Sequence, residues 1–261
     1  RVERMPEWDE DPELGFSQFA VVEPFQRRFQ VNTNWLEEMS TSLGSLRIGR
    51  FVDDAPVDLS QYGLDPPQAG LLVSDEENTL DLLVGAETEE GRYAKFSQSP
   101  SVFVLARIEP LVSVRPYDTI SAFALIINID LVDRFVVESP EATYTGRIER
   151  TPVEGEEEPE ASYFLNDQEI EEDLFKDLYQ WAIGMQFDAE IPLGERAATE
   201  REPLAAITYH LNNDMGPLEV SFVPQNANFA AVMREGSGEF LIARAKVRRM
   251  LDAFEEAAAA L

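Results

Sequence analysis

The sequence predicts an α+β fold made of two tandem repeats, each an antiparallel β-meander sheet with helices packed on one face. Two observations support this prediction. Pro56 and Pro192 are separated by the same interval as Pro67 and Pro203, because 192 − 56 and 203 − 67 both give 136. Short apolar runs separated by polar turns also recur in the same order in the two halves. Duplicated segments are expected to fold alike and to pack as neighbours.

The two halves also match in apolar residues at this interval, which predicts that equivalent positions share their burial. The sharpest tests are Leu43 with Tyr179 and Phe51 with Phe187. The other correspondences are Met39 with Phe175, Tyr93–Ala94 with Phe229–Ala230 and, one residue out of step, Phe103–Arg107 with Phe240–Arg244.

The predicted organisation has three segments. Residues 1–15 are rich in charge and hold two prolines, which is typical of a tether or a loosely docked arm. The first repeat is expected over 16–118 and the second over 119–261, and the two can pack as one globular unit.

In the first half, short strands are predicted at 19–22 and 28–31. A helix follows, because apolar residues from Trp35 to Leu46 recur at spacings of three and four. Asn32 to Asn34 offer cap oxygens, and the helix should end near 47–49. Consecutive prolines exclude a helix at 60–67. Strands at 69–73, 80–84, 92–96 and 102–106 then form the meander, followed by a brief helix at 108–114.

In the second half, strands are predicted at 132–138, 143–150 and 162–165. The Gly, Pro and Glu residues of 152–160 predict a mobile hairpin tip. The next helix carries an apolar stripe from Leu174 to Met185, with Asn166 or Asp167 as its cap. Strands at 206–211, 218–223, 229–234 and 239–243 repeat the meander, and a helix beginning near Arg244 closes the chain.

The composition excludes several classes of function. Asp and Glu number 50 against 21 Lys and Arg, a formal charge of −29 that repels phosphate backbones, so nucleic acid is not an expected partner. The absence of cysteine excludes disulfides, thiol catalysis and zinc–thiolate sites, and it fits the cytosol and a bacterial surface equally. No apolar run reaches the roughly 18 residues of a spanning helix. Because the chain begins at Arg1, we expect any signal or anchor to lie upstream.

No catalytic, cofactor-binding or metal-ligating residue is predicted. His210 is the only histidine and lies on a predicted strand, where a strand-face role is favoured over a triad base. The acidic runs at 9–11, 75–77 and 154–160 lack calcium-loop spacing and are interpreted as solvated loops. The glycine-rich segment at 235–238 is interpreted as a hairpin turn. For Trp35 and Trp181, core packing is favoured over a sugar-binding role.

One basic cluster stands out near the C-terminus, formed by Arg244, Lys246, Arg248 and Arg249. It is a candidate surface for docking an acidic partner. The alternative is pairing within the fold, for example between Arg248 and Asp252 four residues apart. Arg107 and Arg244 occupy matching places after the fourth strand of each repeat, which favours a structural role for both.

Several motifs resemble the bacterial domain-of-unknown-function 4340 family. They are the YGLDPP turn at 62–67, the hairpin end Leu82–Gly85, the pair Arg92–Tyr93 and the strand Val102–Leu105. The resemblance covers residues 36–138 and extends weakly towards the C-terminus. It implies an N-terminal membrane helix, a large extracytoplasmic part and, for some members, genes beside ABC transporters of the gliding-motility type. It supplies no catalytic residues.

We therefore predict an extracytoplasmic, membrane-tethered binding or scaffolding module on the bacterial cell membrane. Its expected partner is a protein of a membrane-associated assembly, with no nucleic acid and no cofactor, and with membrane contact only through a helix upstream of Arg1. The sequence does not indicate the ligand or the oligomeric state. The alternatives are a surface or secreted hydrolase acting on a polymer through an unidentified carboxylate pair, and a cytosolic domain whose acidity serves solubility.

Overall fold

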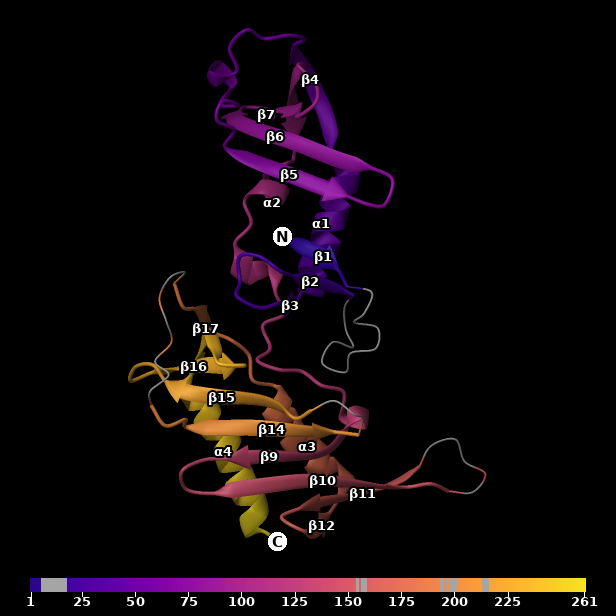
Figure 1. Cartoon of the computed structure of the whole chain (residues 1–261), viewed down its shortest axis with the longest axis vertical. Helices are drawn as coiled ribbons and strands as arrows, with labels where there is room; N and C mark the ends of the chain where they lie inside the picture. The colour runs from indigo at the N-terminus through magenta and orange to yellow at the C-terminus, as the bar shows by residue number, and fades with distance from the viewer. Residues whose placement is uncertain are drawn as a thin grey trace. The chain divides into compact units, whose positions relative to one another are not determined.

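The computed structural model describes residues 1–5, 18–153, 155, 159–192, 195, 197, 201–212 and 216–261. The chain forms two compact units, each with its own antiparallel sheet and helices (Figure 1). The main unit comprises 1–31 and 120–261, and the inserted unit comprises 32–119. The predicted α+β class is therefore confirmed.

The inserted unit begins with helix α1 (Thr33–Ser45), whose N-cap is the predicted Asn32. The Oδ1 of Asn32 accepts hydrogen bonds from the backbone N–H groups of Asn34 at 3.1 Å and Trp35 at 3.3 Å. The following elements are β4 (Arg47–Asp53), η3 (Ser60–Tyr62), β5 (Ala69–Ser74), β6 (Thr79–Thr88), β7 (Gly91–Phe96), β8 (Val102–Ala106), α2 (Glu109–Val112) and η4 (Pro116–Thr119). The strands pair in the order β4-β8-β7-β6-β5.

The core of the inserted unit lies between one face of this sheet and the two helices. Leu82, Val84, Ala94, Phe103 and Leu105 are buried on that face. Helix α1 contributes Met39 and Leu43, its C-cap residue is Leu46, and α2 contributes Leu111 and Val112. The apolar positions of α1 thus lie against the sheet as their helical spacing predicts.

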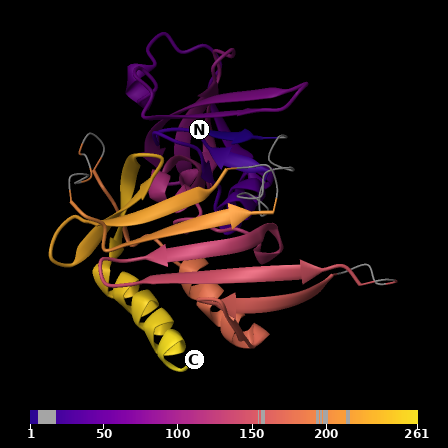
Figure 2. The ribbon, with the colours of Figure 1, turned by 60° about the horizontal axis from the view of Figure 1, so that its bottom comes forward.

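The main unit is built on a nine-stranded sheet in the order β12-β11-β10-β9-β14-β15-β16-β17-β13. Its strands are β9 (Val132–Glu138), β10 (Thr143–Thr151), β11 (Glu160–Leu165), β12 (Gln168–Ile170), β13 (Ala189–Glu190), β14 (Ala205–Leu211), β15 (Leu218–Pro224), β16 (Phe229–Arg234) and β17 (Ser237–Ala243), and η5 (Ile129–Leu131) precedes them. Helices α3 (Glu172–Ile183) and α4 (Arg244–Ala259) lie on the same face of the sheet (Figure 2).

Phe135 on β9 is the point where both helices meet the sheet. Its ring lies 5.6 Å from that of Phe175 on α3 and 5.9 Å from that of Phe254 on α4. Gly146 pairs with Phe135 across β9 and β10, and a Cβ at this glycine would come within 2.3 Å of the ring. The lack of a side chain at 146 therefore makes room for the aromatic core.

The first 31 residues differ from the prediction, because the strands they form belong to the main unit. Val2–Arg4 forms β1, which pairs with β2 (Phe19–Val21), and β2 pairs with β3 (Phe29–Gln30). Of the tether or loosely docked arm predicted for 1–15, residues 2–4 form a paired strand, while 6–15 lie outside the described residues. Residues 18–31 belong to the main unit because Phe25 and Phe29 place their rings 5.3 and 5.0 Å from Phe240.

The two meanders share one strand order, since β4-β8-β7-β6-β5 corresponds to β13-β17-β16-β15-β14. Rows of paired residues also correspond. Ala69, Val84, Ala94 and Phe103 lie across one sheet, and Ala205, Phe222, Val232 and Phe240 lie across the other. Most members of both rows are buried.

A uniform interval of 136 residues does not hold through these rows. Phe51 is 64% exposed and Phe187 is 4% exposed, so the predicted equality of their burial is wrong. Phe51 pairs with Phe103, whereas the counterpart of Phe103, Phe240, pairs with Glu190. The interval drifts because the turns of the two meanders differ in length. Leu43 is half-buried and Tyr179 is buried, a closer match.

Other sequence predictions need correction. Strands β4, β12 and β13 were not expected. Asn166 and Asp167 do not cap α3; they adopt φ of 48° and 66° in the turn between β11 and β12, and the N-cap is Glu171. Trp181 is 42% exposed and so lies outside the core, whereas Trp35 is half-buried.

Within the predicted mobile tip at 152–160, residues 154 and 156–158 are outside the described residues. No helix of the described residues has the length and apolar character needed to cross a bilayer.

Candidate functional site

The predicted basic cluster divides into two pairs on α4. Lys246 Nζ lies 2.7 Å from Asp188 Oδ1 and donates to the carbonyl oxygen of Gln186, so its charge is used within the fold. Arg249 Nε donates to the carbonyl oxygen of Ala245 in its own helix at 3.4 Å. Arg244 and Arg248, one helical turn apart, instead line a common cleft.

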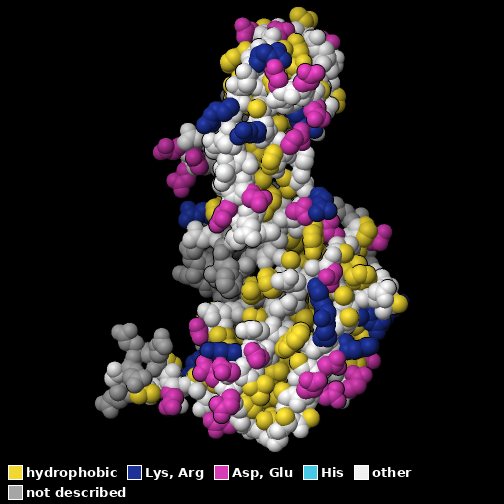
Figure 3. Space-filling view, turned by 180° about the vertical axis from the view of Figure 1, so that it is seen from behind, with side chains coloured by type: hydrophobic (Ala, Val, Ile, Leu, Met, Phe, Trp, Pro, Cys, Tyr) yellow, Lys and Arg dark blue, Asp and Glu magenta, His cyan; other side chains and the backbone are white. Residues whose placement is uncertain are grey.

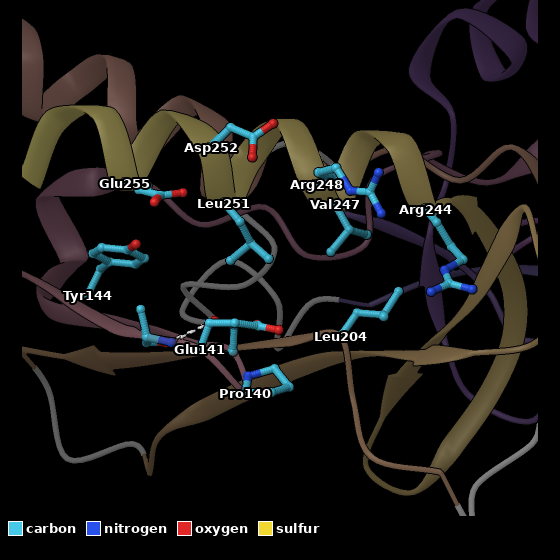
Figure 4. Close-up of a pocket in the computed structure, with 12 residues that line it drawn as sticks. Pro140, Glu141, Tyr144, Leu204, Arg244, Val247, Arg248, Leu251, Asp252 and Glu255 are labelled. Carbon is cyan, nitrogen blue, oxygen red and sulfur yellow. Dashed lines mark hydrogen bonds between the residues drawn. The ribbon is translucent and has the colours of Figure 1, made fainter. Parts of the chain in front are cut away.

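This α4 cleft encloses ≈ 420 Å³ between the helix and the end of the sheet. A stripe of α4 residues at helical spacing forms one wall, and the β9–β10 turn with the start of β14 forms the other (Figure 4). The lining residues are Ser139, Pro140, Glu141, Ala142, Tyr144, Leu204, Arg244, Val247, Arg248, Leu251, Asp252 and Glu255. Its size is within the range of small-molecule and peptide side-chain sites.

The sheet-side wall of the cleft is rigidly built. The turn is closed by a backbone hydrogen bond from Ser139 N–H to the carbonyl of Ala142 at 2.8 Å, and Ser139 Oγ accepts from the Ala142 N–H at 3.0 Å. Tyr144 follows the turn and stacks on Phe254 with ring centroids 5.7 Å apart. Burial, with the nearby Glu255 carboxylate, raises the pKa of the Tyr144 hydroxyl, which therefore stays protonated at neutral pH.

Charge is distributed unevenly along the α4 cleft. Arg244 and Arg248 lie at one end, Glu255 lies beside Tyr144 at the other, and Val247 and Leu251 lie between them (Figure 4). Arg244 Nη1 donates to the carbonyl oxygen of Asn226 at 3.3 Å.

Within the described residues, neither arginine of the cleft is ion-paired with a carboxylate. The predicted pairing of Arg248 with Asp252 is thus not formed. The cleft is therefore amphipathic and bipolar.

A second surface lies on the inserted unit. Phe51 and Phe96 flank the buried Phe103, with ring centroids 6.1 and 5.2 Å from it, and both lie on the face that carries α1 and α2. Phe51 and Phe96 are exposed at this end of the face. We call Phe51, Phe96 and Phe103 the aromatic patch. Figure 3 shows hydrophobic side chains exposed among charged ones on this unit.

The remaining sequence candidates have structural roles. Asp75 Oδ1 accepts hydrogen bonds from the N–H groups of Glu77 and Asn78, which lowers the pKa of the carboxyl and closes the β5–β6 turn. Residues 235–238 form the β16–β17 hairpin, as predicted, with Gly236 at φ 77°.

His210 lies on β14 and accepts a hydrogen bond from Arg134 Nη2 at 3.0 Å. Among the residues the structure describes, no group of three or more His, Asp or Glu could hold a metal ion. The acidic run at 9–11 lies outside those residues.

Sequence reasoning found the two arginines of the α4 cleft but missed the residues opposite them. Glu141, Tyr144 and Leu204 come from distant positions in the chain and reach the cleft only through the pairing of β9 with β10 and β14. The aromatic patch was also missed, because Phe51 was expected to share the burial of Phe187 and Phe96 was considered only as part of a strand. The spacing of Arg244 and Arg248 was the one available signal, since residues four apart share a helix face.

Together, these features define an α+β protein with three antiparallel sheets, an arginine-lined cleft and an aromatic patch whose Phe51 and Phe96 are exposed. The chain belongs to the family described as domain of unknown function (DUF4340), whose model matches residues 25–178, more than half of the chain. The match spans the whole inserted unit and the main unit as far as α3. No curated protein and no solved structure matches the chain.

Proposed function

We propose that the protein is a binding or scaffolding module that docks a protein partner through the aromatic patch of the inserted unit. One observation carries this proposal. Phe51 and Phe96 lie on the helix-bearing face of the sheet on either side of Phe103, and they are 64% and 38% exposed although both are large aromatic side chains. Apolar side chains gathered on one surface mark interaction sites, and aromatic residues are enriched at protein interfaces.

Site-specific crosslinking in cells tests the docking proposal. A photoreactive side chain at 51 or 96 should yield a discrete adduct with one membrane-fraction protein. Leu72 offers a matched control, because it is 68% exposed but its place in β5 is on the opposite face of the sheet. Phe51→Ser with Phe96→Ser should abolish the adduct. Equal adducts from position 72, or none from 51 and 96, would contradict the proposal.

We further propose that the module is displayed outside the cytoplasm, anchored by a helix that precedes Arg1, as an accessory component of an assembly such as an ABC transporter. The motifs quoted in the sequence analysis imply this placement, and the charge of −29 would keep the units off an anionic lipid surface. Fractionation of the full-length protein, with protease added to intact and to opened cells, is the test. Recovery without detergent would reject the anchor.

The two meanders are proposed to descend from one duplicated segment. Support comes from their common strand order and from the corresponding rows that end at Phe103 and Phe240. In an experimental structure, residues 36–107 should superpose on 172–244, helix on helix and strand on strand. A mismatch in the direction or sequence of the strands would argue for convergence.

A further inference from the structure

We propose that the α4 cleft of the main unit is a second binding site, which takes an extended peptide segment carrying an acidic group, an apolar middle and a basic group. The acidic group would lie at Arg244 and Arg248, the apolar side chains over Leu204 and Leu251, and the basic group at Glu255. This site is on a different unit from the aromatic patch, so it stands or falls independently of the proposed function.

The arginine end selects the acidic group. Arg244 and Arg248 lie one helical turn apart and line the same cleft, so their guanidinium groups can bind one anionic group together. Among the described residues Arg248 makes no ion pair, and Arg244 uses one donor on the carbonyl of Asn226. Each guanidinium has five N–H donors arranged to receive a carboxylate. A ligand carboxylate would therefore meet several free donors from one helix face.

The acidic end restricts the ligand to one that also carries a positive charge. Glu255 and the protonated Tyr144 hydroxyl lie together at that end, and Glu141 lies on the opposite wall (Figure 4). These carboxylates would repel a ligand with several negative charges, such as a polyphosphate. A peptide segment is favoured because it can hold opposite charges at both ends of an apolar stretch.

The middle of the cleft supplies the apolar contact. Val247 is fully buried, while Leu251 and Leu204 are half-buried and lie on opposite walls of the cleft (Figure 4). Covering half-buried aliphatic carbon removes apolar surface from water without moving the fold. The turn at 139–142 is already closed by its own hydrogen bonds, so the wall is formed before a ligand arrives.

Titration of the full chain with short peptides tests the site. The probe is an N-acetylated, C-amidated tetrapeptide of one aspartate, two leucines and one lysine, followed by NMR or calorimetry. Saturable binding with a dissociation constant on the order of 1 mM or tighter is expected. A control peptide with asparagine and glutamine in place of the charged residues should bind about tenfold more weakly or not at all.

Matched variants on α4 separate the site from general charge effects. Arg248→Gln should weaken the probe about tenfold, because it removes charge-assisted hydrogen bonds without disturbing any bond within the described fold. Arg249→Gln, one residue further along, removes the same charge outside the cleft and should leave binding within about twofold. Melting curves establish that each variant is folded.

Three outcomes would overturn the proposal: no saturable binding, equal binding of the charged and uncharged peptides, or equal loss in the two variants. Glu255→Gln adds an independent arm, since it should weaken the lysine-containing probe and not an analogue with leucine at that place. Loss of the aromatic-patch adduct with intact peptide binding would leave this site standing.

Discussion

Two buried tyrosines of the main unit differ in whether the hydroxyl group stabilises or destabilises the core. Tyr179 donates to the carbonyl oxygen of Ile127 at 2.9 Å, whereas the hydroxyl of Tyr209 has no hydrogen-bond partner among the described residues. Burial raises the pKa of both, so both hydroxyls are neutral. A satisfied buried hydrogen bond stabilises by about 1 kcal/mol, and an unsatisfied polar group costs about 1–3 kcal/mol.

The two tyrosines should therefore respond oppositely to removal of the oxygen. Tyr179→Phe is expected to lower the free energy of unfolding by about 1 kcal/mol, and Tyr209→Phe to raise it by a similar amount. Each variant keeps the aromatic ring, so packing is matched. Denaturant unfolding measures the difference. A loss of stability in Tyr209→Phe as large as in Tyr179→Phe would show that the Tyr209 hydroxyl is in fact satisfied.

His210 gives a second residue-scale prediction with a clean signal, because it is the only histidine. Burial, followed by the charge of Arg134, lowers its pKa below the ordinary 6.5. At pH values between the lowered pKa of the folded chain and the ordinary pKa of 6.5, the unfolded chain binds a proton that the folded chain does not. The free energy of unfolding therefore falls as the pH falls through this range. NMR titration of the imidazole should report the lowered pKa. Arg134→Ala should raise it to a limited extent, since burial remains; no change would contradict the contact.

At the scale of elements, the N-cap of α1 offers a local test. Asn32 accepts from two backbone N–H groups at the start of a helix that buries no residue completely. Asn32→Ala should lower the free energy of unfolding of the inserted unit by about 1 kcal/mol. Asn34→Ala is the control, since it changes a neighbouring asparagine and leaves the cap oxygen in place. Thermal melting followed by circular dichroism compares them, and equal losses would exclude a specific cap.

The elements that the sequence predicted are those with a strong local period. The stripe of α1, the cap at Asn32 and the eight meander strands follow from spacing and turn chemistry. Strand β13 was missed because Ala189–Glu190 is short and exists only by pairing with β17, which is distant in the chain. The predicted helix cap at Asn166 or Asp167 was wrong because the residue types that cap helices also form turns with positive φ.

The same limit applies to the α4 cleft. Positions 244 and 248 share a helix face, so the sequence could predict that Arg244 and Arg248 lie together. It could not predict the ion pair of Lys246 with Asp188, which is distant in the chain. The opposing wall depends on β9 pairing with both β10 and β14. Long-range pairing of this kind is decided by the whole core around Phe135 and not by any local segment.

At the scale of the whole molecule, residues 32–119 form a unit inserted in the sequence between residues 31 and 120 of the main unit. The Asn32 N–H donates to the Thr119 carbonyl at 2.8 Å, and Val31 forms a β-bridge with Ile120. The points of departure and return therefore adjoin, as in insertions that domains tolerate. Replacing 32–119 by a short glycine–serine linker should leave the main unit folded, and 32–119 alone should fold on its own core.

Cooperative melting of each fragment, with dispersed NMR spectra, would bear out this division. A main unit that loses its cooperative transition when 32–119 is removed would show that the two units depend on one another for stability. The contact between Phe29 and Phe240 is a suitable reporter of folding in the main unit, because Phe29 lies close in sequence to the junction at residue 31.

The adjoining junction strands also determine how tension would travel through the chain. Gln30 to Asn32 and Thr119 to Ser121 run antiparallel, joined by the Val31–Ile120 bridge and by hydrogen bonds on either side of it. A pull between Arg1 and Leu261 would load the main unit first and leave 32–119 outside the line of force. Once the main unit unfolded, the hydrogen bonds of the junction would break one after another, starting from the pair Gln30 and Ser121. The inserted unit would then add length of up to ~3.3–3.6 Å for each residue released.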